Sequence, residues 1–431
     1  MKIIYGISLA ILTLGTVPVC AQEAHPTHRD ISPVDIIGKG DKADSTEVYK
    51  AFRENSPAAF HVPDAPRFAI VGKNRSFYLG IGGQVKATLG YDFGSPIHNA
   101  NEFATSAIPM HPDKGNGALV QFSAMQSGLF VNFVALPDNP NRIGAYFNFN
   151  LINGDNYGFN LVYAYIRYRG FTVGYDYSLF SDMAAAPPTI DYEGPNAFTA
   201  IPNGVIDYRH SFGKHFSLGA GIEMPQASYT VGQYTRNVSQ RVPDIPAYLQ
   251  WAFTGNSRIR LSAIIRNITY RDIPADKNRN AVGWGIKLSG TVQPIPWLTA
   301  YYQACYGKGI ASYFQDLNGQ GLDLTPDPAA HGKLKPTEAW GGYLGLQFNI
   351  TKKLYCSGTF SYLRAYPGKY QGGETLWSDQ YKYARYVVGN VFYNFNSILS
   401  CGLEYIYGSR RDMSGLTRHD NRLQTMLQVS F

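Results

Sequence analysis

Alternation of apolar and polar side chains with a two-residue period recurs along most of this chain, in segments of about ten residues separated by turn-forming clusters. In residues 282–288, for example, Val, Trp, Ile and Leu alternate with two glycines and a lysine. This period is that of a β-strand whose two faces meet different surroundings, whereas helical periodicity is nearly absent. The pattern predicts an all-β protein.

The connections between these segments alternate in length. Short turns fall at Phe212–Lys214, Thr254–Asn256, Pro294–Pro296, Thr351–Lys353 and Asn394–Asn396. Longer, more polar connections lie near residues 94–117, 174–196, 228–245, 272–280, 308–336, 367–378 and 408–420. This alternation is typical of an up-and-down meander whose two ends face different environments, as in transmembrane barrels.

The N-terminus has the features of a cleaved secretory signal. Lys2 precedes the apolar run Ile3–Val17, and Val19, Cys20 and Ala21 are the residues before a cut after Ala21. The alternative is a lipoprotein cut that leaves Cys20 first, and Val19 is a poor residue to precede a lipidated Cys. Beyond this signal no run approaches the roughly 18 apolar residues that a membrane helix needs. The chain is therefore expected to be exported.

The last segment of the chain points to the bacterial outer membrane. Leu427, Val429 and Phe431 lie on the apolar face of an amphipathic strand, and a terminal aromatic there resembles the insertion signal of Gram-negative outer-membrane proteins. Because backbone polar groups in hydrocarbon must be paired, a β-protein can span a bilayer only as a closed barrel. We predict a transmembrane antiparallel up-and-down β-barrel of about 16 strands, inserted by the barrel-assembly machinery and surrounded by outer-membrane lipid. A barrel of this size leaves a lumen too wide for wall side chains to fill.

The expected organisation has three parts. Residues 1–21 are the signal peptide, residues 22–67 are a periplasmic N-terminal segment, and residues 68–431 are the barrel, which no linker or charge block divides. The N-terminal segment holds one short helix, because Asp44 and Glu47 have the spacing of a capping box ahead of an apolar run.

One connection differs from the others in composition. Residues 174–196 are broken at Pro187 and Pro188, and carry Asp182, Asp191 and Glu193. A loop this long, with its own prolines and charges, usually has a task beyond connection.

Two stretches resemble one family, the DcaP-type trimeric porins. Residues 68–93 are similar to the family's entry into its first strand, and residues 174–196 are similar to its fifth strand and the loop that follows. The loop residues that fit the family pattern are Asp182, Pro188, Ile190, Asp191, Tyr192, Gly194 and Pro195. At Gln126-Ser127-Gly128 the family's usual arginine is missing, so that arginine's role is not transferred. The resemblance, which covers residues 68–431, implies a third external loop that folds inward, a homotrimer, and uptake of small anionic solutes such as dicarboxylates.

The positive charges of the chain also favour a pore that prefers anionic solutes. The formal net charge is +7, and an Arg or Lys facing lipid at the midplane costs roughly 2–4 kcal/mol. We therefore expect a basic wall inside the pore, formed by Arg209, Arg258, Arg260, Arg266, Lys287 and Arg385. Opposite the acidic loop of Asp182, Pro187, Pro188, Asp191 and Glu193, this wall would create a transverse field that concentrates anions. The alternative is that the arginines lie near the barrel rim or pair with acids such as Asp207, Glu223 and Glu404, and that the loop acids only cap turns or bond arginines of the wall.

Passive diffusion of small hydrophilic solutes through an outer-membrane porin is thus the leading function. Cofactors and metals are not expected, because CxxC and HxxxH spacings are absent, and nucleic acid is not an expected partner. The alternatives are a receptor or adhesin barrel, or a barrel hydrolase. A hydrolase would need a nucleophile and a base, and the nearest candidates are His210 with Ser211 and His419 with Asp420.

Overall fold

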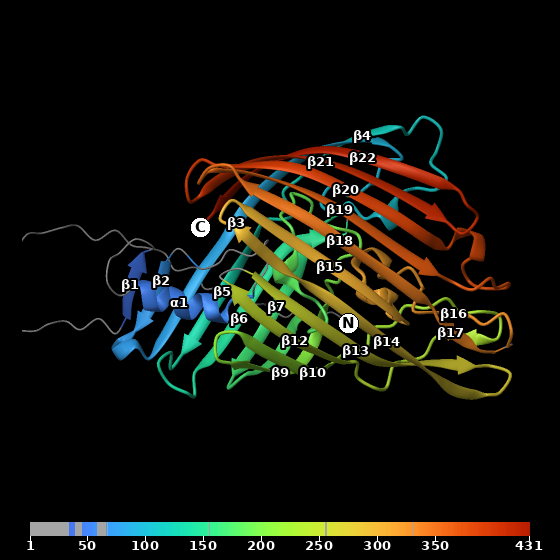
Figure 1. The fold of residues 1–431 in the computed structure, drawn as a ribbon, viewed down its shortest axis with the longest axis horizontal. Helices are drawn as coiled ribbons and strands as arrows, with labels where there is room; N and C mark the ends of the chain where they lie inside the picture. The colour runs from blue at the N-terminus through green and yellow to red at the C-terminus, as the bar shows by residue number, and fades with distance from the viewer. Residues whose placement is uncertain are drawn as a thin grey trace, which may run out of the picture. The chain divides into compact units, whose positions relative to one another are not determined.

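A computed structural model describes residues 34–38, 45–57, 66, 68–154, 156–254, 257–330 and 332–431. The predicted signal peptide lies outside these residues. Sixteen antiparallel strands form a closed barrel, with β4 and β5 together making one interrupted strand (Figure 1). They are β3 (Phe77–Gly94), β4 (Ala118–Ser123), β5 (Gly128–Ala135), β6 (Ile143–Asn153), β7 (Asn156–Tyr168), β8 (Phe171–Tyr177), β9 (Pro202–Phe212), β10 (Phe216–Glu223), β12 (Ile245–Thr254), β13 (Ser257–Asp272), β14 (Lys277–Ile295), β15 (Leu298–Lys308), β18 (Glu338–Asn349), β19 (Leu354–Tyr366), β20 (Tyr381–Asn394), β21 (Leu399–Asp412) and β22 (Thr417–Ser430).

The barrel closes where the last strand pairs with the first. The β22–β3 ladder runs from Asp420 opposite Gly94 to Ser430 opposite Gln84. Beyond it, Gly83 and Phe431 exchange two backbone hydrogen bonds, of 2.7 and 2.9 Å. This ladder leaves the sheet without a free edge, which is what a β-structure in hydrocarbon requires.

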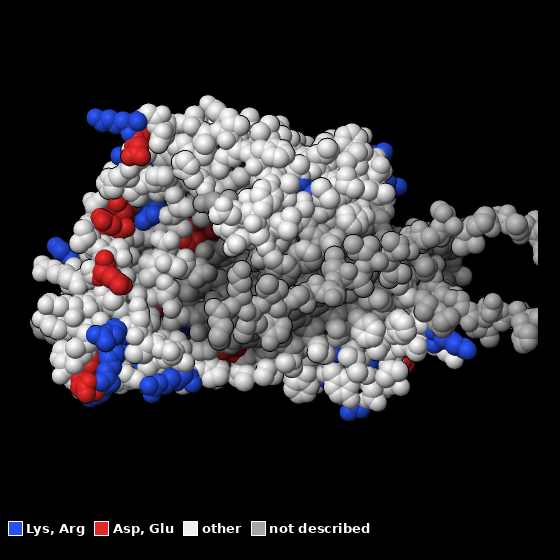
Figure 2. Space-filling view, turned by 180° about the vertical axis from the view of Figure 1, so that it is seen from behind, with Lys and Arg blue, Asp and Glu red and all other residues white. Residues whose placement is uncertain are grey.

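The two faces of the strands differ as the two-residue period predicts. On β13, Leu261 and Ile265 are exposed on the outer face, whereas Ser262 and Arg266 are buried on the inner face. Charged side chains gather at the two ends of the molecule, with a broad uncharged band between them (Figure 2). An apolar outer band of this kind suits contact with lipid. Among the described residues, no helix is long and apolar enough to cross a membrane.

Connections at the two ends of the barrel differ in length. One end, called here the short-turn end, carries short connections such as residues 169–170, 213–215 and 395–398, and among the described residues the longest there is 136–142. The opposite, long-loop end carries five long connections, at residues 95–117, 178–201, 224–244, 309–337 and 367–380. Within them lie the short strands β11 (Thr235–Arg236), β16 (Leu324–Pro326) and β17 (Leu334–Pro336), and the 3-10 turns η2 (Thr105–Ala107), η3 (Met183–Ala185), η4 (Ala311–Tyr313), η5 (Gln315–Leu317) and η6 (Trp377–Asp379).

Two of the predicted long loops are wrong. The connections near 272–280 and 408–420 are tight turns, because the strands continue pairing to Asp272–Lys277 and to Arg411–Thr417. The polar residues there belong to strands, not to loops. Residues 124–127 interrupt one barrel strand between β4 and β5.

The chain before the barrel contains the predicted helix. Helix α1 (Ser45–Asn55) lies at the short-turn end, beside β5 and β6 (Figure 1). Strand β1 (Val34–Gly38) pairs with β2 (Phe68–Gly72), and β2 pairs with the first half of β3 after the 3-10 turn η1 (Lys73–Arg75). Residues 68–72 therefore form a strand that precedes the barrel strand β3.

The outer face can be tested with matched charge insertions. Ile265 is 60% exposed in the middle of β13, and Ile295 lies at the hairpin end of β14. Because burial of a charge in hydrocarbon depends on depth, Ile265→Arg is expected to cost about 2–4 kcal/mol and Ile295→Arg only about 0–1 kcal/mol. Unfolding temperature, followed by gel mobility of the folded barrel, measures both. Equal loss in the two variants would contradict the assignment of β13 to the membrane.

Candidate functional site

The 178–201 loop contacts the inner wall of the barrel far from its own strands. The carbonyl oxygen of Ile190 accepts a 2.9 Å hydrogen bond from Lys86 Nζ on β3. The backbone amides of Ile190 and Asp191 donate to the carboxylate of Glu404 on β21, at 2.8 and 2.9 Å. Lys86 and Glu404 are both buried on the inner face. The tip of the loop is therefore bound to the strands on either side of β22.

Proline carbonyls extend this contact along the wall. The carbonyl oxygen of Pro188 accepts from Asn390 Nδ2 at 2.9 Å and from Ser357 Oγ at 3.1 Å. Further back along the loop, Tyr343 Oη donates to the carbonyl oxygen of Ala185 at 2.9 Å. Since Pro has no amide hydrogen, the two adjacent prolines break local backbone pairing and leave the carbonyl groups free to accept bonds from the wall. The loop thus touches β18, β19 and β20 as well as β21 and β3.

Asp182 joins the same loop to two arginines of the predicted basic wall. Its carboxylate forms a bidentate pair with Arg258 at 2.8 and 2.9 Å, accepts from Ser289 Oγ at 2.7 Å, and lies 3.6 Å from Arg260. Burial opposes ionisation of Asp182, but Arg260 and Arg258 outweigh it and hold the pKa of this carboxyl below its usual range. The structure therefore places Asp182 in direct contact with the basic wall instead of across a gap from it.

The other predicted wall residues have different surroundings. Lys287 is buried beneath the loop, where Nζ donates to Thr199 Oγ1 at 2.8 Å. Arg209 pairs with Asp207 and Asp176, each at 2.9 Å. Arg385 is exposed on the same face of β20 as Val387, so it lies on the outer side of the barrel.

An open space remains between the loop and strands β7, β9, β12 and β13. This arginine pocket has a volume of about 100 Å³ and is lined by Arg167, Arg209, Arg260, Asp176 and Asp182, together with Pro57, Tyr163, Tyr177, Ser178, Leu179, Ser181, Met183, Ala184 and Tyr248. Arg260 lies over the ring of Tyr248, 4.2 Å from its centroid. Such stacking holds a guanidinium in place while leaving its edge available for hydrogen bonds.

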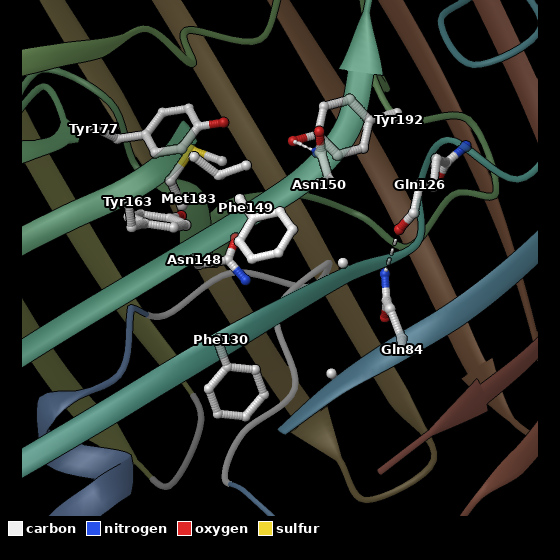
Figure 3. Close-up of a pocket in the computed structure, with 13 residues that line it drawn as sticks. Gln84, Gln126, Phe130, Asn148, Phe149, Asn150, Tyr163, Tyr177, Met183 and Tyr192 are labelled. Carbon is white, nitrogen blue, oxygen red and sulfur yellow. Dashed lines mark hydrogen bonds between the residues drawn. The ribbon is translucent and has the colours of Figure 1, made fainter. Parts of the chain in front are cut away.

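A second pocket adjoins the first and differs from it in chemistry. This amide pocket has a volume of about 40 Å³, carries no charged lining residue and shares Tyr163, Tyr177 and Met183 with the arginine pocket. Figure 3 shows its amides among aromatic rings, with Asn150 bonded to Tyr192 and Gln84 bonded to the backbone of Gln126. The two pockets therefore meet at residues that the loop and strands β7 and β8 supply.

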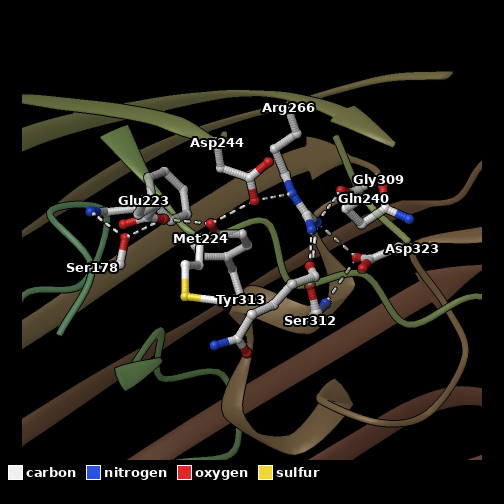
Figure 4. Close-up of polar contacts among 12 residues, drawn as sticks. Ser178, Glu223, Met224, Gln240, Asp244, Arg266, Gly309, Ser312, Tyr313 and Asp323 are labelled. Carbon is white, nitrogen blue, oxygen red and sulfur yellow. Dashed lines mark hydrogen bonds and ion pairs between the residues drawn. The ribbon is translucent and has the colours of Figure 1, made fainter. Parts of the chain in front are cut away.

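Arg266 is the centre of a buried network that anchors three long loops (Figure 4). Its guanidinium bonds Asp244 at 2.9 Å, Asp323 at 3.1 Å and the carbonyl oxygen of Gly309 at 2.6 Å. Tyr313 links this group to Glu223, which also accepts from Ser178 Oγ at 2.9 Å. The side chain of Arg266 has no exposed area. It therefore holds loops 178–201, 224–244 and 309–337 to the inner face of the barrel through this network.

Carboxylates also tie the loops to one another. Asp191 accepts from the amide of Phe103 at 2.8 Å, and Asp316 accepts from Thr105 Oγ1 at 2.6 Å. Burial and the neighbouring Glu404 raise the pKa of Asp191 to about 7. Burial, Asp316 and Glu102 raise the pKa of Glu193 well above its usual range. Loops 95–117, 178–201 and 309–337 thus meet around carboxyl groups that resist ionisation.

Two residues of the site, Lys86 and Arg167, did not emerge from the sequence. Glu404 was expected only as a possible partner of the wall arginines, and the structure shows it bonded to loop backbone instead. A signal for Arg167 existed, since it shares the inward parity of Tyr163 and Tyr165, but the predicted basic wall did not include it. For Lys86 and Glu404 the functional contact is with loop backbone, which no side-chain pattern marks.

The candidate catalytic pairs do not assemble. His210 and Ser211 are adjacent residues of β9, and His419 and Asp420 are adjacent residues of β22. Neighbours in a strand point to opposite faces of the sheet. Asp420 instead accepts from the amide of Ile97 at 3.1 Å.

Comparison with known proteins gives a consistent result. A family profile described as "Porin subfamily" matches residues 132–425. The outer membrane channel DcaP of Acinetobacter baumannii has a TM-score of 0.70 at 17% sequence identity, covering 84% of this chain and 99% of that one. An anion-selective porin from Comamonas acidovorans has a TM-score of 0.52 at 10% identity, covering 82% and 100%. A trimer form of OmpT from Vibrio cholerae has a TM-score of 0.50 at 10% identity, covering 83% and 100%. A search of curated proteins found no match.

Asp182→Asn tests the contact between loop and wall. The change leaves Arg258 and Arg260, which are partly exposed, without their carboxylate, so the expected cost lies below the about 3–5 kcal/mol of a fully buried pair. Reversal potential under a salt gradient is also expected to shift toward anions, because one negative charge is lost. Asp113→Asn, which removes the same charge from an exposed loop position, is the control. Identical shifts in both variants would contradict the contact.

The raised pKa of Asp191 leads us to expect that the stability of the folded protein depends on pH. Because the pKa of its carboxyl is raised to about 7 in the folded protein, the protonated form is favoured on folding. The contribution of this carboxyl to the free energy of unfolding is fully present below its pKa in the unfolded chain, about 3.9. As the pH rises from there to about 7, this contribution is lost at about 1.4 kcal/mol per pH unit. The unfolding temperature of the wild type, taken relative to Asp191→Asn, is expected to fall between pH 4.5 and 7 and then level off. A constant difference across this range would contradict the assignment.

Proposed function

Since the chain belongs to the porin family, we propose that it is a passive diffusion channel that favours small anionic solutes. It is an outer-membrane porin of the Gram-negative type in fold and family. The preference for anions is the finer inference, and it depends on the side chains around the arginine pocket.

The balance of charge in and around this pocket is the observation that carries the proposal. Four arginines, at 167, 209, 258 and 260, face three carboxylates, at 176, 182 and 207. One positive charge therefore remains around this pocket. Low-dielectric walls strengthen the field of such a charge and raise the local concentration of anions.

Two of the arginines are the proposed contacts for a solute. Arg167 and Arg260 lie 3.8 and 3.6 Å from their nearest carboxylate oxygens, distances longer than hydrogen bonds, whereas Arg258 is held by a bidentate pair. A carboxylate can accept two parallel bonds from a guanidinium. Here it would bond the nitrogens that remain after Arg260 Nε donates to Gln250 and Arg167 Nη1 donates to the carbonyl oxygen of Asn55, each at 3.0 Å. The 178–201 loop forms the constriction in this proposal. It is held inside the barrel by Pro187, Pro188, Asp191 and Glu193, which do not themselves contact the solute.

A homotrimer is the proposed assembly. The trimer form of OmpT has the fold of this chain, and barrels of this class associate through their outer faces. Three channels in one particle would open as conductance steps in groups of three.

Planar-bilayer recording tests the channel and its selectivity together. The purified protein is expected to give large, roughly ohmic steps in threes and a reversal potential of the sign for anion preference. Arg167→Gln and Arg260→Gln are each expected to shift that potential toward cations, because the positive charge in the pocket is lost. Arg385→Gln removes an arginine from the outer face and is expected to leave it unchanged.

Two outcomes would contradict the proposal in different ways. A folded protein that gives no current would overturn the channel itself. A wild-type preference for cations would overturn the role of the arginine pocket while leaving the porin intact.

A further inference from the structure

Helix α1 packs on the inner face of the barrel wall. Asn55 Nδ2 donates to Asn132 Oδ1 at 2.7 Å, and Asn132 Nδ2 donates back to the carbonyl oxygen of Phe52 at 3.0 Å. Asn132 is fully buried on β5, and it alternates with the partly exposed Val131 and Phe133 of the outer face. The helix therefore lies within the mouth of the barrel at its short-turn end.

The contact buries an apolar face of the helix as well as these amides. Val48 and Phe52 join one buried cluster with Val134 of β5. Phe52 has no exposed area, and its ring lies 6.3 Å from that of Tyr78 on β3. Full burial of such a side chain contributes about 1.5–3 kcal/mol. The charged residues Glu47, Lys50 and Arg53 remain exposed on the opposite face.

Two glycines of the wall make room for the helix. A Cβ atom on Gly144 of β6 would lie 2.0 Å from Asn55 Oδ1. A Cβ atom on Gly80 of β3 would lie 3.0 Å from the ring of Phe52 and 2.2 Å from Pro66. A side chain at either position would clash with the residues through which the helix contacts the wall.

The C-terminal end of α1 reaches the arginine pocket. The carbonyl oxygen of Asn55 accepts from Tyr165 Oη at 2.7 Å and from Arg167 Nη1 at 3.0 Å. The carbonyl groups at a helix C-terminus carry partial negative charge and favour a nearby cation. Pro57, just beyond the helix, lines the pocket itself.

We propose that α1 is a permanent part of the channel, which narrows its short-turn end and positions Arg167 for the passing solute. This inference rests on the proposed function, because it assigns α1 a role in the conductance and anion preference of the same pore. Asn55 is a positioning residue here, since it acts on the solute through Arg167. The helix stays bound while the channel conducts.

Substitutions on the two sides of the contact test this proposal. Gly144→Val alters only the wall, and Phe52→Asp alters only the helix. Each is expected to raise single-channel conductance, because the mouth widens, and to move the reversal potential toward zero, because Arg167 loses its fixed position. Gly389→Val is the matched control, because a Cβ atom on Gly389 would meet nothing within 4 Å. Gel mobility confirms that each barrel is folded.

A double variant separates positioning from simple widening. In an Arg167→Gln background, Gly144→Val is expected to raise conductance but to shift the reversal potential no further. Wild-type conductance and selectivity in both folded single variants would overturn the role of α1 while leaving the porin intact. A reversal potential that still moves in the Arg167→Gln background would overturn the positioning of Arg167. Absence of current in the wild type would instead contradict the proposed function.

Discussion

Pairing of every backbone N–H and C=O group inside hydrocarbon is the constraint on which this structure depends. Antiparallel strands meet it by closing β22 onto β3, from Asp420 to Ser430. Closure of sixteen strands has a second consequence, since the enclosed lumen is too wide for wall side chains to fill. Inside the barrel, the 178–201 loop and helix α1 bond inward-facing side chains of the wall.

Buried charges hold these segments in place. Asp182 binds Arg258, Arg266 binds Asp244 and Asp323, and Glu404 binds the backbone of the 178–201 loop. Removing such charges from water costs energy that their attraction roughly offsets, so pairs of this kind contribute little net stability. Their effect is geometric, because breaking one leaves an unpaired charge inside the protein.

Much of the barrel was predictable from local patterns, whereas the contacts inside it were not. The two-residue period and the turn clusters predict the strands and the position of the loop that contains Asp191, because both depend on neighbouring residues only. Polar residues near 272–280 resemble a loop, yet they belong to strands, since strands that extend into water need no apolar face. The register shift between Tyr381 and Tyr383 changes the phase of β20 near Arg385, and such irregularities leave no simple signal in sequence.

Contacts between distant segments were the hardest to predict. Helix α1 is visible in its capping pattern, but its site on the wall depends on Gly80 and Gly144, which look like ordinary strand glycines. Asp182 was expected opposite the basic wall, and only the fold shows that it bonds Arg258 of that wall directly. Pairing between residues far apart in sequence is set by the closed barrel as a whole.

Fixation of the 178–201 loop inside the barrel is the central claim, and amide hydrogen exchange of the folded protein tests it most directly. The amides of Ile190 and Asp191 donate to the buried Glu404, and that of Phe103 donates to Asp191. These amides are expected to be protected as strongly as those of the strands, while the more exposed 367–380 loop exchanges faster. Equally fast exchange in both loops would contradict a constriction held by buried contacts.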